Sequence, residues 1–179
     1  MKRIAALFIF LIGITGYTHA QDKHGTLVDW YTIEKAQELN KENPKKILID
    51  VYTDWCKWCK VMDNKTFSHP KIAEYINENY YAVKFDAESK EPVTFRGETY
   101  TNNGKNHQLA SSLLQGRLAF PSIAYLDENL QLLSPVPGFK KPHQMEPILK
   151  FFGEDIYKNQ GWKEFEKNFD GEIEAPAGE

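Results

Sequence analysis

Residues 47–60 read ILIDVYTDWCKWCK, and this stretch decides the fold. Residues 47–53 form a nearly continuous apolar run, interrupted only by Asp50, and such a run is typical of a strand buried on both faces. Cys56 and Cys59 follow at once, and a helical pattern continues after them. The sequence therefore predicts that the two cysteines lie where a buried strand gives way to a helix.

Helices and strands alternate on either side of this stretch. The hydrophobic periodicity predicts helices over residues 32–43, 109–114, 145–152 and 162–169, and a helix after Cys59 that kinks or restarts near Ser68 and Pro70. It predicts a strand over 80–85 and a closing hairpin over 122–126 and 130–136. Between them, an irregular region 87–105 contains a small hairpin around Gly97. This order predicts an α/β fold with a central mixed sheet, helices on both faces, a closing β-hairpin and a C-terminal helix.

The N-terminus has the pattern of a signal peptide. Lys2 and Arg3 precede an apolar run over residues 4–14, and the segment closes with Thr18-His19-Ala20. The apolar run is short for a membrane span, so we expect cleavage after Ala20 and export, to the periplasm or as a secreted protein. The expected division is a signal peptide over 1–20, a lead-in over 21–30, one domain over 31–153, and a helical extension with a flexible tail over 154–179.

Composition excludes one class of partner. The chain has 179 residues, a formal net charge of -3 and an isoelectric point near 6.0. It therefore lacks the broad basic field that draws proteins to nucleic acid, and no nucleic-acid partner is expected.

The chemistry resides in Cys56 and Cys59. Unpaired N–H groups and a partial positive charge at a helix N-terminus favour the thiolate, which is the nucleophile in disulfide exchange. If Cys56 caps the helix, its sulfur is the more exposed and attacks a substrate disulfide, and Cys59 then resolves the mixed disulfide. Lys57 and Lys60 add positive charge that favours the thiolate further.

Two other interpretations of the cysteine pair stay open. A purely structural disulfide would close a loop so small that it contributes only roughly 2 kcal/mol. A zinc site would need two further ligands, and the four histidines of the mature chain are scattered singly, as surface or capping residues are. No metal and no cofactor are predicted.

Residues 47–60 resemble the active-site strand and helix start of the thioredoxin family, because the cysteine pair comes with its preceding Trp55, its following Lys60 and the strand before it. The resemblance covers about residues 30–153 and implies the thioredoxin fold. It also implies that Asp50 assists proton transfer to Cys59, with Lys84 beside it on the next strand. An aspartate that is hydrogen-bonded only for structural reasons is the alternative.

The resemblance extends to the Phe120-Pro121 peptide, which implies a cis-proline opposite the cysteine pair that pairs with a substrate peptide. Residues 66–86 look most like exported thioredoxin-like proteins and the reductase-type C-terminal domains of membrane electron transporters. Two departures concern Lys57-Trp58, where general thioredoxins have Gly-Pro, and the long region 87–105, which is either a substrate-contacting lip or a surface insertion.

The predicted function is thiol-disulfide oxidation and reduction of protein substrates. Trp55 and Trp58 are expected to form an apolar collar for the substrate, with simple packing as the alternative for each. No histidine lies between the cysteines to stabilise the thiolate strongly, which favours the reducing direction. The alternatives are a disulfide oxidase or isomerase, and a non-catalytic binding module with a structural disulfide. The expected partners are protein thiols and disulfides and a membrane electron-donor protein, with the chain itself a monomer.

Overall fold

The fold is built on one mixed sheet of five strands, in a computed structural model that describes residues 26–176. The predicted signal peptide, residues 1–20, lies outside the described residues. The strand order is β1-β3-β2-β6-β7, with β2 parallel to β3 and antiparallel to β6. The strands are Trp30–Tyr31 (β1), Lys46–Tyr52 (β2), Tyr80–Asp86 (β3), Ser122–Leu126 (β6) and Leu132–Pro137 (β7).

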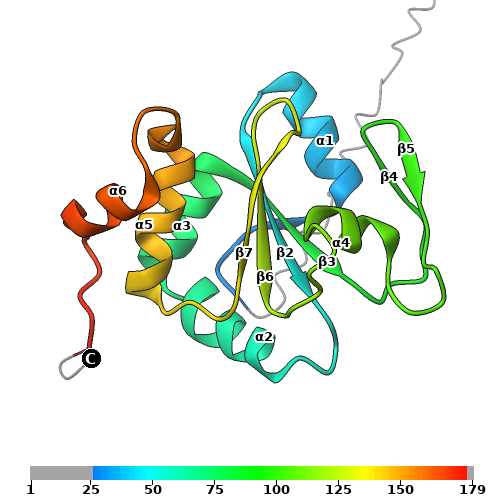
Figure 1. Ribbon diagram of the computed structural model, residues 1–179, viewed down its shortest axis with the longest axis horizontal. Coiled ribbons are helices and arrows are strands. Elements are labelled where there is room, and N and C mark those ends of the chain that lie inside the picture. Colours follow the sequence, from blue (N-terminus) through cyan, green and yellow to red (C-terminus); the bar gives the residue numbers. More distant parts are fainter. Residues whose placement is uncertain (1–25, 177–179) are drawn as a thin grey trace, which may run out of the picture.

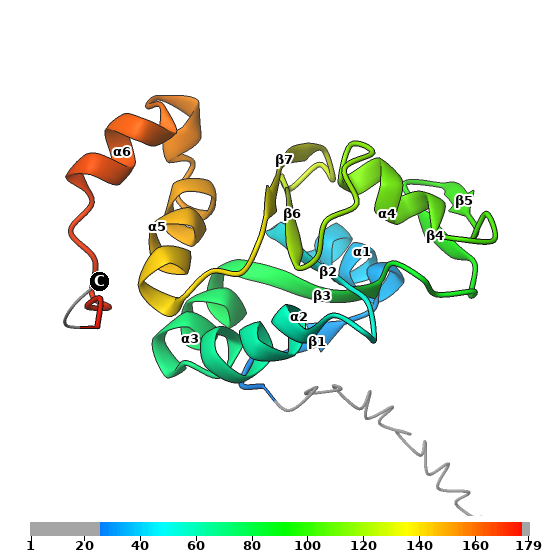
Figure 2. The ribbon, with the colours of Figure 1, turned by 60° about the horizontal axis from the view of Figure 1, so that its bottom comes forward.

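Helices cover both faces of this sheet (Figures 1 and 2). The helices are Ile33–Glu42 (α1), Lys57–Met62 (α2), Pro70–Asn79 (α3), Gln108–Leu113 (α4), Pro142–Gly153 (α5) and Trp162–Asn168 (α6). A π-helical turn, Asp63–Phe67, joins α2 to α3, so the predicted kink near Ser68 is present. No helix within residues 26–176 is long and apolar enough to cross a membrane.

Alternate residues of β2 reach two separate cores. Leu48 packs in a cluster with residues of α3 and α5, whereas Ile47 and Ile49 pack with residues of α1 and α4. Side chains of a strand point alternately to its two faces, so a strand covered by helices on both sides must be apolar throughout. The arrangement confirms the predicted fold class, including the closing hairpin of β6 and β7 and the helix that follows it.

The first strand was not predicted from the sequence. Trp30 and Tyr31 pair in parallel with Ala82 and Val83 of β3 and form an edge of the sheet. Trp30 is 3% exposed and Val28 is fully buried, so the end of the expected lead-in 21–30 belongs to the folded core. A two-residue strand is too short to show the alternation on which a strand prediction depends.

The C-terminal extension differs from the expected flexible tail. Both carboxylate oxygens of Glu146 in α5 accept hydrogen bonds from backbone N–H groups, one from Glu172 at 2.9 Å and one from Ile173 at 3.0 Å. Ile173 also packs against the core cluster. Residues 172–173 are therefore fastened to α5, because a buried glutamate supplies acceptors that the tail composition does not reveal.

The region 87–105 contains the predicted small hairpin, formed by Val93–Phe95 (β4) and Glu98–Tyr100 (β5). The hairpin is attached to α1 through the Gln37 amide, which donates to the carbonyl of Thr94 and accepts from the N–H of Arg96, both at 2.8 Å. The hairpin of the insertion thus lies beside α1, away from the end of the sheet that carries α2 (Figure 1).

Candidate active site

The cysteine pair begins α2, directly after β2 and a short turn. Cys56 is the N-cap residue, and its sulfur accepts a hydrogen bond from the N–H of Cys59 at 3.1 Å. Cys56 and Cys59 are joined in a disulfide. The strand and the helix start therefore place the disulfide at a helix N-terminus, where the local partial charge favours a thiolate once the bond is reduced.

The sulfur-bearing residues are buried and the tryptophans beside them are exposed. Cys56 is 3% exposed and Cys59 is 2% exposed, so the greater exposure expected for Cys56 is not found in the oxidised pair. Trp55 and Trp58 are 66% and 57% exposed, which makes them the two most exposed large apolar side chains of the described residues. Exposed aromatic rings around a reactive bond are typical of a surface that binds a protein partner.

The Phe120-Pro121 peptide bond is cis. Phe120 and Pro121 line a hollow of about 300 Å³ together with Trp58, Gly138 and Phe139. The Trp58 ring lies 5.4 Å from the ring of Phe139. The hollow thus opens beside the cysteine pair and has an apolar lining, which suits an apolar side chain of a bound peptide.

Trp55 contacts the cis-proline segment and the insertion. Its ring packs edge-on against Phe120 with the centroids 6.0 Å apart, and its indole N–H donates to Glu88 at 3.1 Å. Glu88 belongs to the first residues of the insertion 87–105. The insertion therefore contacts one of the predicted substrate-binding residues at its beginning, although its hairpin does not.

Asp50 and Lys84 meet in the core beneath this surface. They are register partners on the parallel strands β2 and β3, and the Lys84 ammonium donates to an Asp50 carboxylate oxygen at 2.7 Å. The Asp50 side chain is fully buried and the Lys84 side chain is 4% exposed. Their contact is the one that the resemblance to thioredoxins implied, while the catalytic role of Asp50 stays a prediction.

Asp63 is a third member of this charge cluster, and it was not predicted from the sequence. It lies in the π-helical turn after α2, and its carboxylate also accepts from the Lys84 ammonium. Asp63 follows Cys59 by four residues, a spacing that puts two side chains on one face of a helix. That spacing was the available signal, but only the packing of the helix on the sheet brings Asp63 to Lys84.

Lys84 is also enclosed by aromatic rings. Its ammonium nitrogen lies 4.9 Å from the ring centroid of Trp30, 5.3 Å from that of Tyr52 and 5.4 Å from that of Phe67. Burial lowers the pKa of Lys84, but the charges of the two aspartates outweigh it, so the pKa lies above its ordinary value of 10.5. The lysine is therefore a fixed positive charge at physiological pH.

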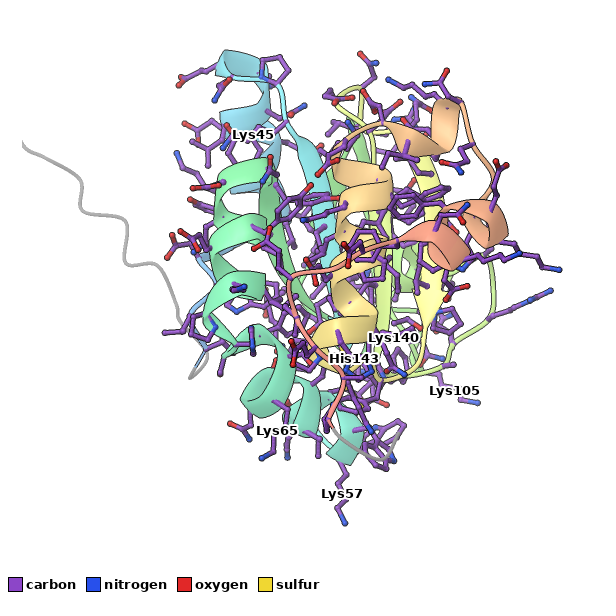
Figure 3. All side chains as sticks on the ribbon, turned by 90° about the vertical axis from the view of Figure 1, so that its left-hand side faces the viewer. Lys45, Lys57, Lys65, Lys105, Lys140 and His143 are labelled. Carbon is purple, nitrogen blue, oxygen red and sulfur yellow. A yellow bond between two sulfur atoms is a disulfide. The ribbon has the colours of Figure 1, made fainter. Side chains whose placement is uncertain are left out.

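The two lysines of the cysteine motif are exposed. Figure 3 shows Lys57 at the lower end of the molecule with its side chain directed away from the protein. Neither lysine makes a side-chain hydrogen bond or ion pair among the described residues, so their effect on the cysteines stays a prediction that depends on charge alone.

No group of three or more histidine, cysteine or acidic residues within residues 26–176 could hold a metal ion. His107 is buried and caps α4, where its ring accepts from the N–H of Leu109 at 3.2 Å. Both cysteines are used in the disulfide. The chemistry that the described site can supply is thiol-disulfide exchange.

Fold and site together define the class, a thioredoxin-fold protein with the Cys-x-x-Cys disulfide of the thiol-disulfide oxidoreductases. The sequence matches the family model Thioredox_DsbH, described as "Protein of unknown function, DUF255", over residues 17–114, more than half of the chain. The chain belongs to this family.

Individual relatives are similar over parts of their length. An uncharacterized protein of Caenorhabditis elegans, B0495.5, is 34% identical over 67 residues, which are 37% of this chain and 9% of that protein. The thiol:disulfide interchange protein DsbD of Pectobacterium atrosepticum is 23% identical over 140 residues, 75% of this chain and 22% of that protein. The chain thus spans less than a quarter of the length of either relative.

Among solved structures, the DsbH oxidoreductase superposes with a TM-score of 0.52 at 17% sequence identity, covering 71% of this chain and 85% of that one. At this identity the likeness supports the fold, which agrees with the sheet order and the helix layers described above.

Proposed function

We propose that this protein reduces disulfide bonds of protein substrates through Cys56 and Cys59. The observation that supports the proposal most strongly is the position of the disulfide. It begins α2 at the surface, between exposed Trp55 and Trp58 and next to the hollow at Pro121. A disulfide that served stability alone would need neither the exposed rings nor the adjacent hollow.

The reaction starts from the reduced pair. The Cys56 thiolate attacks one sulfur of the substrate disulfide, so one S–S bond forms as another breaks, and the departing substrate thiolate takes up a proton. Cys59 then loses its proton and attacks the Cys56 sulfur, which releases the second substrate thiol. Two electrons and two protons pass to the substrate, and a dithiol donor must reduce the pair again.

Asp50 is proposed as the base that accepts the Cys59 proton. A carboxylate without exposure to water carries a cost unless it is paired, and Lys84 supplies the pairing charge. Asp63 shares the same lysine, so the cluster holds two acids and one cation. One carboxylate can therefore take up a proton while the lysine still balances the charge of the other.

Export, partners and oligomeric state are parts of the same proposal. The pattern of residues 2–20 supports export with removal of a signal peptide, to the periplasm or beyond the cell. The similarity to the thiol:disulfide interchange protein DsbD supports protein thiols and disulfides as partners, and we propose a membrane protein as the electron donor. The net charge of -3 supports the absence of a nucleic-acid partner, and we propose that the protein works as a monomer without a cofactor.

Trapping of the mixed disulfide tests this function. With Cys59→Ala, the attack by Cys56 has no resolving thiol, so a model disulfide protein such as insulin should stay covalently attached and appear as a dithiothreitol-sensitive adduct on a non-reducing gel. Cys56→Ala is the matched control and should form less than about a tenth as much adduct, since the helix N-terminus at which Cys56 is the cap favours the Cys56 thiolate. Equal trapping by both variants, or none by either, would contradict the assignment.

A further inference from the structure

Lysines gather at the end of the molecule that carries the cysteine pair. Figure 3 shows Lys57, Lys65 and Lys140 at the lower end, where α2 lies, with Lys105 also toward this end. Lys57, Lys60 and Lys65 are exposed, and none of them has an ion pair among the described residues. These lysines gather at one end of a chain whose overall net charge is -3.

One of these lysines, Lys140, contacts the turn that lines the hollow beside the disulfide. The Lys140 ammonium donates to the carbonyl of Pro137 at 2.7 Å and to that of Gly138 at 3.2 Å. Gly138 and its neighbour Phe139 line the hollow with Trp58. Lys140 thus brings a positive charge to the turn that lines the hollow, while the Lys57 side chain, one residue before Trp58, is directed away from the protein at the same end of the molecule.

The acidic groups near the pair are mostly engaged. Asp54 is exposed beside Trp55 in the chain, whereas Glu88 accepts from the indole N–H of Trp55. Asp63 is bound to Lys84. Two of these three acids thus have a partner, while Lys57, Lys60 and Lys65 have no ion pair among the described residues.

We propose that the substrates are disulfides flanked by acidic residues, with an apolar side chain in the hollow at Trp58 and carboxylates against Lys57, Lys60 and Lys65. This assignment of a substrate class rests on the proposed reductase function. Charge complementarity of this kind raises the rate of encounter and weakens as salt screens the charges.

The test compares two disulfide peptides that share one sequence except for the residues next to the cystine, which are Asp and Glu in one and Lys in the other. The measured quantity is the ratio of their kcat/KM values with the reduced full-length protein, because changes in thiolate reactivity cancel in that ratio. We expect the acidic peptide to react about tenfold faster at low ionic strength. The preference should fall to about twofold or less at 1 M salt.

Charge-reversed variants locate the effect. Lys57→Glu combined with Lys65→Glu should remove or invert the preference, whereas Lys41→Glu combined with Lys163→Glu, on α1 and α6 away from α2, should retain it. Equal rates for the two peptides, or a preference that the Lys57 and Lys65 reversal leaves intact, would overturn the substrate class alone. Failure to reduce either peptide would overturn the reductase function and this assignment with it.

Discussion

Lys84 organises the buried charges beneath the cysteine pair. It is the cation between Asp50 and Asp63, and three aromatic rings surround it. A buried ion pair is costly to break from one side, because the remaining partner keeps its charge without compensation. The pairing of Lys84 is therefore a requirement of the fold as well as of the proposed proton transfer.

Replacing Lys84 by Met should lower the free energy of unfolding of the oxidised protein by about 3 kcal/mol at neutral pH. The pKa of Lys84 is raised in the folded state, so its contribution is complete below the unfolded pKa of 10.5 and is lost as the pH rises through the folded value. Urea titrations should show a constant difference from the wild type between about pH 7 and 10, which narrows above. Lys41→Met, at an exposed site, should change stability by less than about 0.5 kcal/mol. If the difference in unfolding free energy between Lys84→Met and the wild type stayed unchanged above about pH 10, Lys84 would not stabilise the fold through its charge.

Replacing Asp50 by Asn should slow the resolving step, because Cys59 then loses its assisting base. We expect kcat/KM with a protein disulfide to fall about 100-fold at pH 7. The deficit should shrink as the pH passes about 8.5, where thiols ionise unaided. Asp54→Asn, an exposed carboxylate two residues before Cys56, is the control and should show little loss at any pH. A loss with Asp50→Asn that does not depend on pH would instead indicate a structural role.

At the scale of elements, the helices and strands with long apolar patterns were predictable, and the attachments between them were not. The runs that form β2 and β6 show their burial directly in the sequence, since both faces of each are covered. β1 has too few residues to show a period. The fastening of residues 172–173 depends on Glu146, which lies 26 positions before Glu172 in the chain. No local sequence pattern therefore indicates it.

Gly171 leaves little room for a side chain where the C-terminal segment is fastened to α5. A Cβ there would lie 2.8 Å from a carboxylate oxygen of Glu146 and 2.8 Å from the Phe169 ring. Gly171→Ala should therefore release the tail and lower the hydrogen-exchange protection of the Glu172 and Ile173 amides at least about tenfold. Gly161→Ala is the matched control, because its Cβ would meet nothing within 4 Å. Retained protection in Gly171→Ala would show that another contact holds the tail.

The site residues that match single positions of the family motif could be predicted from the sequence. Contacts between segments far apart in the chain could be predicted less well. The pairing of Asp50 with Lys84 follows from two adjacent parallel strands in register. The contacts of Asp63 with Lys84 and of Glu88 with Trp55 join segments whose meeting depends on how α2 and the insertion pack. Such contacts are tertiary, and a periodicity cannot specify them.

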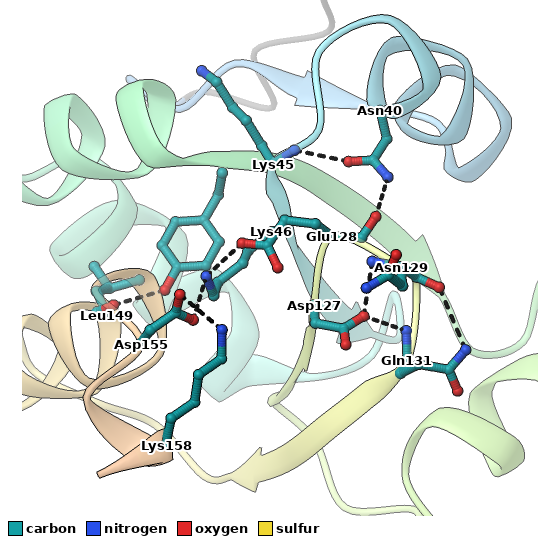
Figure 4. A network of polar contacts seen from close by, with 11 residues as sticks. Asn40, Lys45, Lys46, Asp127, Glu128, Asn129, Gln131, Leu149, Asp155 and Lys158 are labelled. Carbon is teal, nitrogen blue, oxygen red and sulfur yellow. Dashed lines mark hydrogen bonds and ion pairs between the residues drawn. The ribbon is translucent and has the colours of Figure 1, made fainter. Parts of the chain in front are cut away.

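In the molecule as a whole, the disulfide and the Lys46 ion-pair network lie at opposite ends of β2. Figure 4 shows Lys46, at the start of β2, bound to Glu128 of the closing hairpin and to Asp155 after α5, at 2.6 and 2.8 Å. β2 runs from this network to the turn before Cys56. The start of β2 is thus fixed by ion pairs, while the end with the disulfide carries exposed tryptophan rings and, within residues 26–176, lysines without an ion pair.

The reduction potential of the Cys56/Cys59 couple tests the central claim most directly. The protein is equilibrated in glutathione or dithiothreitol buffers, and the fluorescence of Trp55 and Trp58 beside the pair reports its state. We expect a potential near that of thioredoxin, about -270 mV, as a reductase requires. A value near about -120 mV would mark an oxidant and contradict the reducing direction, and a disulfide still closed well below about -300 mV would contradict a redox-active site altogether.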